Sequence, residues 1–348
     1  MPTSHQYFNP KMETIPRDEL RILQEKRIQF QIMHAYANST LIRKRFEKAK
    51  IHPSDIKTIE DFQRKVPPME KDTVRDEREK TEDPYGGVLG VPPTTSLVVG
   101  RSTGTTGIPT FIPFTSEDIS RIAEQWARAL YMVGLRRGDR YALKALFFHM
   151  WPKPHEKGAE LLGLQTLELE IIDVELNLNM LKYFKPKAFW TGTTPFIAIT
   201  NILKSKGLKP KEFIPSLEVV LEGGDYLVSS AYKELKDFWD PVPIHEMWGA
   251  GDPPYVAVNC KPGGLSHLWE DYNFIEFLDP DTKEVVGLGE VGEKTVTPLW
   301  VLAQPYIRWM TEDMEKPEWD KCECGRTHVR VLYLSRRGHT LYVKKKKK

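Results

Sequence analysis

Cysteine is scarce in this chain, with only three among 348 residues. Three thiols cannot build the disulfide framework of a small secreted domain, so the composition favours a reducing compartment and predicts a cytoplasmic protein. Apolar runs are also short, and none approaches the roughly 18 residues that a membrane span needs. The N-terminal stretch MPTSHQYFNPKMETIPRDEL lacks the apolar segment of a signal peptide. We therefore expect neither secretion nor membrane association.

The chain also lacks a large net charge, since it contains 50 Lys and Arg residues and 48 Asp and Glu residues. The terminal run Lys344–Lys348 supplies five of the basic residues, so the body of the chain is slightly acidic. Nucleic-acid-binding domains normally carry a basic stripe within the fold. Nucleic acid is therefore not an expected partner, and the lysine run is typical of a solvated end.

Apolar residues make up 40% of the sequence, which is enough for a sizeable core. They recur at near-helical spacing from Pro16 to Lys50, which predicts one or two amphipathic helices. Ser54 or Thr58 is a suitable N-cap for another helix, which Pro67 would end.

Short strand-like runs then alternate with helical ones, a pattern typical of an α/β fold with a largely parallel sheet. The run Ser96–Gly100 is expected to be a buried strand, and Phe111–Phe114 a returning strand before a helix that starts near Thr115. After Gly249 the sequence changes to Gly/Pro turns and shorter alternating runs, which indicate antiparallel strands.

A loop of small residues, Ser102–Gly107, joins those first two strand-like runs. Hydroxyls and backbone N–H groups in such a loop form a concave anion site, and glycine allows close approach. The chain contains no G-x-x-x-x-G-K-[ST] string, and this loop does not match G-x-G-x-x-G, so neither common nucleotide fingerprint applies to it. By composition alone, a flexible surface turn is the alternative.

The stretch Ser102–Thr110 resembles the S-[ST]-G-T-T-G-x-P-T signature of the adenylate-forming enzymes, the acyl-CoA synthetase superfamily. Further segments resemble its phenylacetate–CoA ligase branch: Ile51–Arg75, Gly158–Glu160, Leu217–Leu227, Gly263–Asp271, Pro305–Asp313 and Cys322–His328. The resemblance runs collinearly from about Met12 to about Arg337.

This resemblance implies the large α/β domain of that family, with β-sheets flanked by helices and an antiparallel portion after about residue 250. Residues 1–95 would form its helical part, 96–335 the AMP-binding core, and 336–348 a hinge remnant with the lysine tail. Family ligases continue into a small C-terminal lid domain that supplies a lysine for adenylation, and we expect this domain to be absent here.

The implied chemistry is attack of a carboxylate on ATP, which gives an acyl-adenylate and pyrophosphate, followed by transfer of the acyl group to CoA. The expected acid is aromatic and phenylacetate-like, and transfer depends on whether the lid is supplied or dispensable. One alternative is a scaffold that binds nucleotide or aryl acid without ligation. Another is a nucleotidyl transferase that adenylylates a different acceptor. A homodimer is left open.

By resemblance, the ATP phosphates would be held by Ser102, Thr103, Gly104, Thr105, Thr106 and Gly107, with Thr105 also catalytic. Many relatives have Lys where this chain has Ile108, so one phosphate cation is missing. The segment Glu222-Gly223-Gly224 matches the family's adenine-lining turn. Trp248, followed by Gly249, replaces the aromatic residue that stacks on adenine.

Other nucleotide contacts depart from the family pattern to different degrees. Asp252 stands where relatives have Glu, and its shorter carboxylate would bind Mg²⁺ as a catalytic group. Asp313 would accept hydrogen bonds from the ribose hydroxyls. Arg308 is assigned to catalysis, with bracing of the site as the alternative role. Arg336 matches the hinge arginine, although the acids that follow it in relatives are absent.

The three cysteines and one histidine suggest a structural zinc site formed by Cys260, His267, Cys322 and Cys324. Three thiolates and an imidazole complete a closed tetrahedron, and the alternative is three reduced, unliganded cysteines. For the acid pocket, relatives place aromatic walls at the positions of Phe148, Trp151 and His155, where core packing is the alternative.

Overall fold

The computed structural model describes residues 6–102, 109–143, 152–169, 173–223 and 229–337. The predicted loop residues 103–107, Gly224, Phe148 and Trp151 lie outside this part of the chain. None of the helices in the described residues is both long and apolar enough to span a lipid bilayer.

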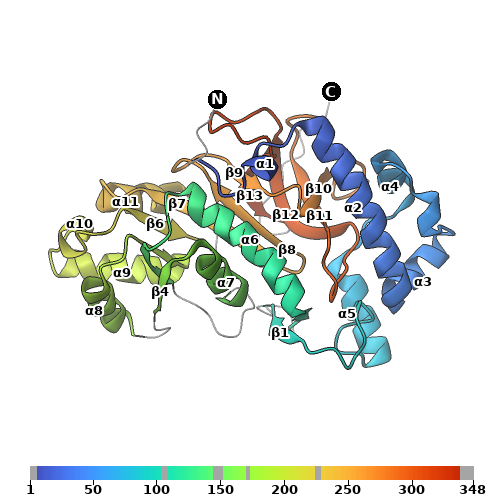
Figure 1. The fold of residues 1–348 in the computed structure, drawn as a ribbon, viewed down its shortest axis with the longest axis horizontal. Coiled ribbons are helices and arrows are strands. Elements are labelled where there is room, and N and C mark those ends of the chain that lie inside the picture. Colours follow the sequence, from blue (N-terminus) through green and yellow to red (C-terminus); the bar gives the residue numbers. More distant parts are fainter. Residues whose placement is uncertain (1–5, 103–108, 144–151, 170–172, 224–228, 338–348) are drawn as a thin grey trace.

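A mixed sheet of 11 strands runs through the described part of the molecule (Figure 1). In spatial order the strands are β10 (Asn273–Leu278), β11 (Gly292–Pro298), β12 (Trp309–Glu318), β13 (Arg330–Arg336), β9 (Ser266–Leu268), β8 (Pro254–Asn259), β7 (Ile244–Gly251), β6 (Val219–Glu222), β5 (Ala188–Thr191), β3 (Arg140–Leu143) and β4 (Gln165–Glu168). Pairing is parallel from β4 to β7 and antiparallel from β7 to β10. The predicted α/β fold and its antiparallel portion are therefore confirmed.

Two groups of helices cover opposite faces of the parallel strands. On one face α6 (Ser116–Met132) and α7 (Pro152–Leu162) pack through Trp126 onto Leu221 and Met247. The other face carries α8 (Val174–Phe184), α9 (Thr193–Ser205), α10 (Pro210–Phe213) and α11 (Ser229–Trp239). Successive residues of β6 alternate between these two cores, as the two-residue period of a strand requires.

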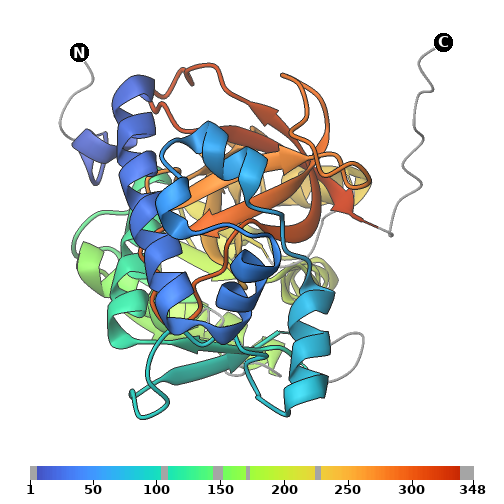
Figure 2. The ribbon, with the colours of Figure 1, turned by 90° about the vertical axis from the view of Figure 1, so that its right-hand side faces the viewer.

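The N-terminal helices lie against the antiparallel strands, at the opposite end from α8–α11 (Figures 1 and 2). They are α1 (Pro10–Glu13), α2 (Arg17–Asn38), α3 (Thr40–Lys48), the 3₁₀ turn η1 (Pro53–Asp55), α4 (Ile59–Lys65) and α5 (Lys71–Thr81). Ile32 and Phe62 share one buried cluster with Phe274 and Trp309. This shared core joins the helical part to the sheet, and a boundary at residue 95 remains a prediction.

The first predicted strand differs from expectation. β1 (Val98–Arg101) and β2 (Phe111–Phe114) pair in antiparallel fashion with each other and form a separate two-stranded sheet. Val99 is 45% exposed because a two-stranded ribbon is not enclosed on both faces. The returning strand is therefore confirmed, whereas the prediction of a buried first strand was wrong.

Asp118 anchors the start of α6, the helix that crosses the sheet. Its carboxylate accepts hydrogen bonds from the backbone N–H of Thr115 (3.0 Å), Leu302 (2.7 Å) and Ala303 (3.1 Å). Thr115 caps the helix in return, with its hydroxyl accepting from the Asp118 N–H at 3.1 Å. One fully buried carboxylate thus joins α6 to a distant loop.

We predict that Asp118→Ala lowers the free energy of unfolding by at least about 3 kcal/mol, because three backbone donors lose a charged acceptor. Urea denaturation provides the measurement. Glu117→Ala is the matched control, since its side chain is 57% exposed and pairs only at the surface with Arg121. This control should change stability by less than about 0.5 kcal/mol. Equal losses in the two variants would contradict the anchoring role.

Candidate functional site

Strand β7 lies at the centre of the candidate nucleotide site, because it belongs to both halves of the sheet. Its first residues pair in parallel with β6, and its last residues pair in antiparallel fashion with β8. Ligands of α/β sheets bind beyond the carboxyl ends of parallel strands. The end of β6 and the second half of β7 are such positions, and they carry Glu222, Gly223, Trp248 and Gly249.

The turn after β6 requires glycine. A Cβ atom on Gly223 would lie 2.0 Å from the carbonyl oxygen of Met247, so no larger residue fits against β7. The preceding Glu222 is buried and accepts a hydrogen bond from the Thr193 hydroxyl in the first turn of α9. Two of the three predicted adenine-lining residues are therefore held in a fixed backbone arrangement.

Trp248 is partly exposed, and its ring packs against two tyrosine rings. Its ring centroid lies 5.9 Å from that of Tyr255 and 5.7 Å from that of Tyr333, with interplanar angles of 88° and 69°. Both tyrosine rings are therefore steeply inclined to the indole plane, and the Lys294 ammonium lies 4.5 Å from the centroid of the indole ring. The arrangement suits a platform for a planar base, as the sequence predicted for this position.

Asp313 lies close to this aromatic group and is held by three neighbours. The Tyr255 hydroxyl donates to Asp313 Oδ2 at 3.1 Å, and the Lys294 ammonium lies 3.5 Å from the same oxygen. Arg336 Nε is 3.9 Å from Asp313 Oδ1. Because the contacts with Tyr255 and Lys294 both fall on Oδ2, Oδ1 is the more available acceptor.

Asp252 directly follows β7 and is partly exposed. Burial raises the pKa of this carboxyl, the positive charges of Lys71 and Arg336 oppose the rise, and the Asp313 carboxylate adds to it. In the described part of the chain no side chain donates a hydrogen bond or forms an ion pair with Asp252. A carboxylate with cations nearby but no direct partner suits a hard divalent cation such as Mg²⁺.

Arg308 is buried apart from these groups. Its guanidinium donates to both Glu276 oxygens at 3.0 and 2.8 Å, and to the backbone carbonyls of Gln63 and Val66 at 2.7 and 2.5 Å. Four of its five donors are thus used inside the protein. These contacts favour the bracing role over the catalytic one, which remains an unsupported prediction.

His155, the predicted pocket residue that the structure describes, lies within the core. Its ring stacks on Trp126 at 4.1 Å, and its Nε2 is 2.7 Å from the Tyr141 hydroxyl. Burial lowers the pKa of His155 to about 3, so the imidazole is neutral. The alternative of core packing describes these contacts better than substrate binding does.

The described ends of the Gly/Thr-rich loop are tied together. Ser102 donates its backbone N–H to the Thr110 carbonyl at 3.0 Å, and its hydroxyl accepts from the Thr110 N–H at 2.9 Å. The hydroxyl of Ser102 therefore closes the base of the loop. Its contact with phosphate stays a prediction.

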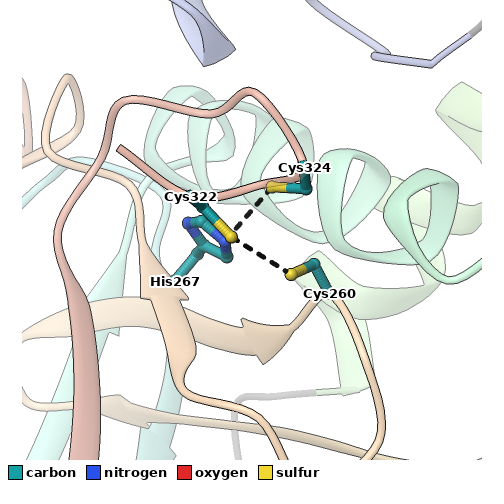
Figure 3. Close-up of side chains that lie close together, drawn as sticks. All are labelled: Cys260, His267, Cys322 and Cys324. Atoms are coloured by element: carbon teal, nitrogen blue, oxygen red, sulfur yellow. Dashed lines mark hydrogen bonds between the residues drawn. The ribbon is translucent and has the colours of Figure 1, made fainter. Parts of the chain in front are cut away.

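The four predicted zinc ligands converge from three segments of the chain (Figure 3). His267 comes from β9, Cys260 follows β8, and Cys322 and Cys324 lie between β12 and β13. Their ligand atoms all lie within 4.8 Å of one another. The Cys260 and Cys322 sulfurs are 3.6 Å apart, and His267 Nε2 is 3.5 Å from the Cys324 sulfur.

These distances and donors fit a tetrahedral ion. Zinc–sulfur bonds of about 2.3 Å give sulfur–sulfur separations of about 3.8 Å in a tetrahedron. The hydrogen bond between Cys260 and Cys324 lowers the pKa of the Cys324 thiol and raises that of Cys260, while His267 lowers the pKa of Cys322. Two of the three thiols therefore favour the thiolate form that binds metals.

The cysteine loop also holds the N-terminal segment. The Tyr7 hydroxyl donates to the Cys324 carbonyl at 2.8 Å, and the buried Arg326 pairs with buried Glu13 at 2.7 Å. His328 Nε2 lies 2.9 Å from the Met12 carbonyl. The order of this loop and the docking of residues 6–17 are consequently linked.

Sequence reasoning missed several residues of the nucleotide site: Lys71, Tyr255, Lys294 and Tyr333. Lys294 could have been noticed, because it lies two residues before Val296 in a strand-like run. The two side chains therefore share the inward face of the strand, where an apolar residue is expected. Lys71 gave no such signal, since it lies in a charged helical stretch.

Comparison with known proteins supports the family resemblance. The GH3 family N-terminal domain profile matches residues 24–167. A phenylacetate-coenzyme A ligase from Thermus thermophilus is 30% identical over 337 residues, covering 93% of this chain and 72% of that protein. One from Aromatoleum evansii is 31% identical over 315 residues, covering 88% and 68%.

Among solved structures, an open conformation of 2-hydroxyisobutyryl-CoA ligase in complex with 2-HIB-AMP and CoA matches with a TM-score of 0.87. It is 23% identical, and the match covers 99% of this chain and 81% of that one. Such a likeness concerns the fold, which is that of the adenylate-forming enzymes. The two relatives above, each at least 30% identical and matched over more than two thirds of its length, show that this chain belongs to the phenylacetate-coenzyme A ligase family.

Proposed function

We propose that this protein is an acid–thiol ligase that activates an aromatic, phenylacetate-like carboxylic acid with ATP and transfers the acyl group to CoA. Attack of the acid's carboxylate oxygen on the α-phosphate forms the mixed anhydride bond of the acyl-adenylate. The bond to pyrophosphate breaks, and pyrophosphate leaves. The CoA thiolate then attacks the acyl carbon, and AMP leaves.

The observation that carries this proposal is the meeting of Trp248, Gly223, Asp252 and Asp313 around β7 in a member of this family. Trp248 would support the adenine ring, and Asp313 would accept hydrogen bonds from the ribose hydroxyls. Positioning of this kind supplies most of the catalysis in an in-line displacement at phosphorus. The Ser102–Gly107 loop would hold the phosphates.

Asp252 is the residue that would hold Mg²⁺, on the strength of its carboxylate and its neighbouring charges. Bound Mg²⁺ would neutralise part of the phosphate charge. Lys71 and Arg336 lie near the same carboxylate and can offset negative charge there.

We predict carboxylate-dependent exchange of labelled pyrophosphate into ATP, with arylacetic acids preferred over fatty acids. Asp313→Ala should lower kcat/KM for ATP by about 10- to 100-fold, because charged hydrogen bonds to two hydroxyls are worth about 1.5–3 kcal/mol. Asp320→Ala, an exposed acid after the same strand, should leave exchange unchanged. ATP binding without any exchange over the acid panel would reject the enzyme and favour a binding scaffold.

We also propose that Cys260, His267, Cys322 and Cys324 bind one structural Zn²⁺. All four tetrahedral positions are taken by side chains, so no position is left for a substrate or a reactive water. The proposed role is to order the loop between β12 and β13. That loop in turn holds the N-terminal segment through Tyr7 and Arg326.

We predict one zinc per chain by metal analysis, and less than about one tenth of that in Cys324→Ser, because removing one ligand of four weakens a closed site strongly. Loss of the metal should expose residues 6–17 to limited proteolysis. Glu323→Gln, whose side chain is 91% exposed in the same loop, is the control and should keep its zinc. Metal content near zero in the wild-type protein would reject the site.

Two expectations from the sequence stay predictions. A cytoplasmic location was inferred from cysteine usage, and a homodimer was left open. Size-exclusion chromatography with light scattering measures the second directly.

A further inference from the structure

A lysine is buried inside the antiparallel half of the sheet. Lys294 has no exposed surface. It lies on β11 two residues before Val296 and opposite Phe277, both of which belong to an apolar cluster. Burying an ammonium among such residues is costly unless it is paired, so its partners indicate what it does.

The Lys294 ammonium has four neighbours from three other strands. It pairs with Glu315 Oε1 of β12 at 2.6 Å and lies 3.5 Å from Asp313 Oδ2 of the same strand. It also lies 4.5 Å from the ring centroid of Trp248 on β7 and 4.2 Å from that of Tyr255 on β8. Both aromatic distances are within the range of cation–π attraction.

The two aromatic contacts cross the sheet rather than follow its pairing. In the strand order, β12, β13, β9 and β8 separate β11 from β7, yet the lysine reaches the Trp248 ring. The antiparallel half must therefore curl until β7 and β8 face β11 and β12. A long side chain is needed to bridge that interior, and a branched apolar residue would not reach both sides.

Glu315 completes the arrangement. It is fully buried, and burial raises its pKa to about 7, although the Lys294 charge lowers it. The ion pair with Glu315 thus makes the burial of Lys294 possible, and this contact concerns stability alone. The remaining contacts of Lys294 are with the Trp248 and Tyr255 rings and with Asp313, which belong to the candidate nucleotide site.

We propose that Lys294 is a positioning residue for the nucleotide: its buried ammonium joins the Trp248–Tyr255 platform to the Asp313 carboxylate and fixes their relative position. The inference rests on the proposed function, since it assumes that base and ribose lie at these two groups. Lys294 does not touch the nucleotide in this account. It acts through the residues that do.

The test compares Lys294→Met with the double variant Lys294→Met/Glu315→Leu. The single variant leaves the Glu315 carboxylate buried without its cation, so we expect a loss of stability. The double variant replaces the ion pair by apolar residues of similar size, an exchange that is often neutral or stabilising. Urea denaturation establishes that it is folded. Lys316→Met, at an exposed position of β12, is the matched charge control for the single variant.

Calorimetric titration then gives Kd for ATP and for 2′-deoxy-ATP. The double variant removes one positive and one negative charge, so its net charge is unchanged, and any remaining effect on the triphosphate weakens both nucleotides alike. The ratio of Kd for 2′-deoxy-ATP to Kd for ATP therefore reports on the ribose contact. We expect the folded double variant to bind ATP about tenfold more weakly, and its ratio to fall from about 10 toward 1, as loss of one charged hydrogen bond would give. Glu315→Gln keeps the ammonium and should retain the wild-type ratio.

The outcomes separate the two proposals. A wild-type ratio and affinity in the folded double variant would overturn the positioning role and leave the proposed function intact. If the wild-type protein binds ATP without preferring it over 2′-deoxy-ATP, Asp313 does not contact the ribose. That result would contradict the ribose contact on which both proposals depend. A change in Lys294→Met equal to the change in Lys316→Met would also overturn the role, because it would reflect the loss of one positive charge alone.

Discussion

The sharing of β7 between two kinds of sheet is the constraint on which the candidate site depends. Parallel pairing with β6 places Gly223 against the carbonyl of Met247, at a distance that no side chain could tolerate. Antiparallel pairing with β8 sets Tyr255 beside Trp248. One strand therefore fixes the backbone turn on one side and the aromatic platform on the other.

Polar groups buried in the antiparallel half extend this arrangement to the remaining strands. Lys294 and Glu315 form an ion pair without exposed surface, and Asp313 lies within reach of the same ammonium. Such a pair contributes little net stability, because the cost of removing two charges from water offsets most of their attraction. The more specific effect of the Lys294 ammonium is geometric, since its contacts with Trp248 and Tyr255 link β11 to β7 and β8, which are not its neighbours in the sheet.

Local patterns in the sequence predicted much of the fold. Near-helical spacing predicted α2 and α3, Thr58 caps α4 as its residue type suggests, and turn-rich texture after Gly249 indicated the antiparallel strands. The partial exposure of β1 was not predicted, because a β-branched run looks the same in a two-stranded ribbon and in a buried sheet. Enclosure is a property of tertiary neighbours.

The parts of the candidate site that could be predicted from the sequence are those in which the type of each residue indicates its chemistry. The three cysteines and His267 converge as expected, because few other arrangements use every thiol of the chain. The network around Lys294 escaped prediction, since its partners come from β7, β8 and β12 and meet only through the curl of the sheet. Likewise, the contacts of Arg308 with the carbonyls of Gln63 and Val66 are set by the docking of α4, which no motif encodes.

The most direct test of the account is a crystal structure of the protein with ATP and phenylacetate, or with the acyl-adenylate formed from them. The account predicts the adenine ring against Trp248 beside Gly223, and both ribose hydroxyls within hydrogen-bonding distance of Asp313. A nucleotide bound elsewhere, or one whose ribose faces away from Asp313, would contradict it.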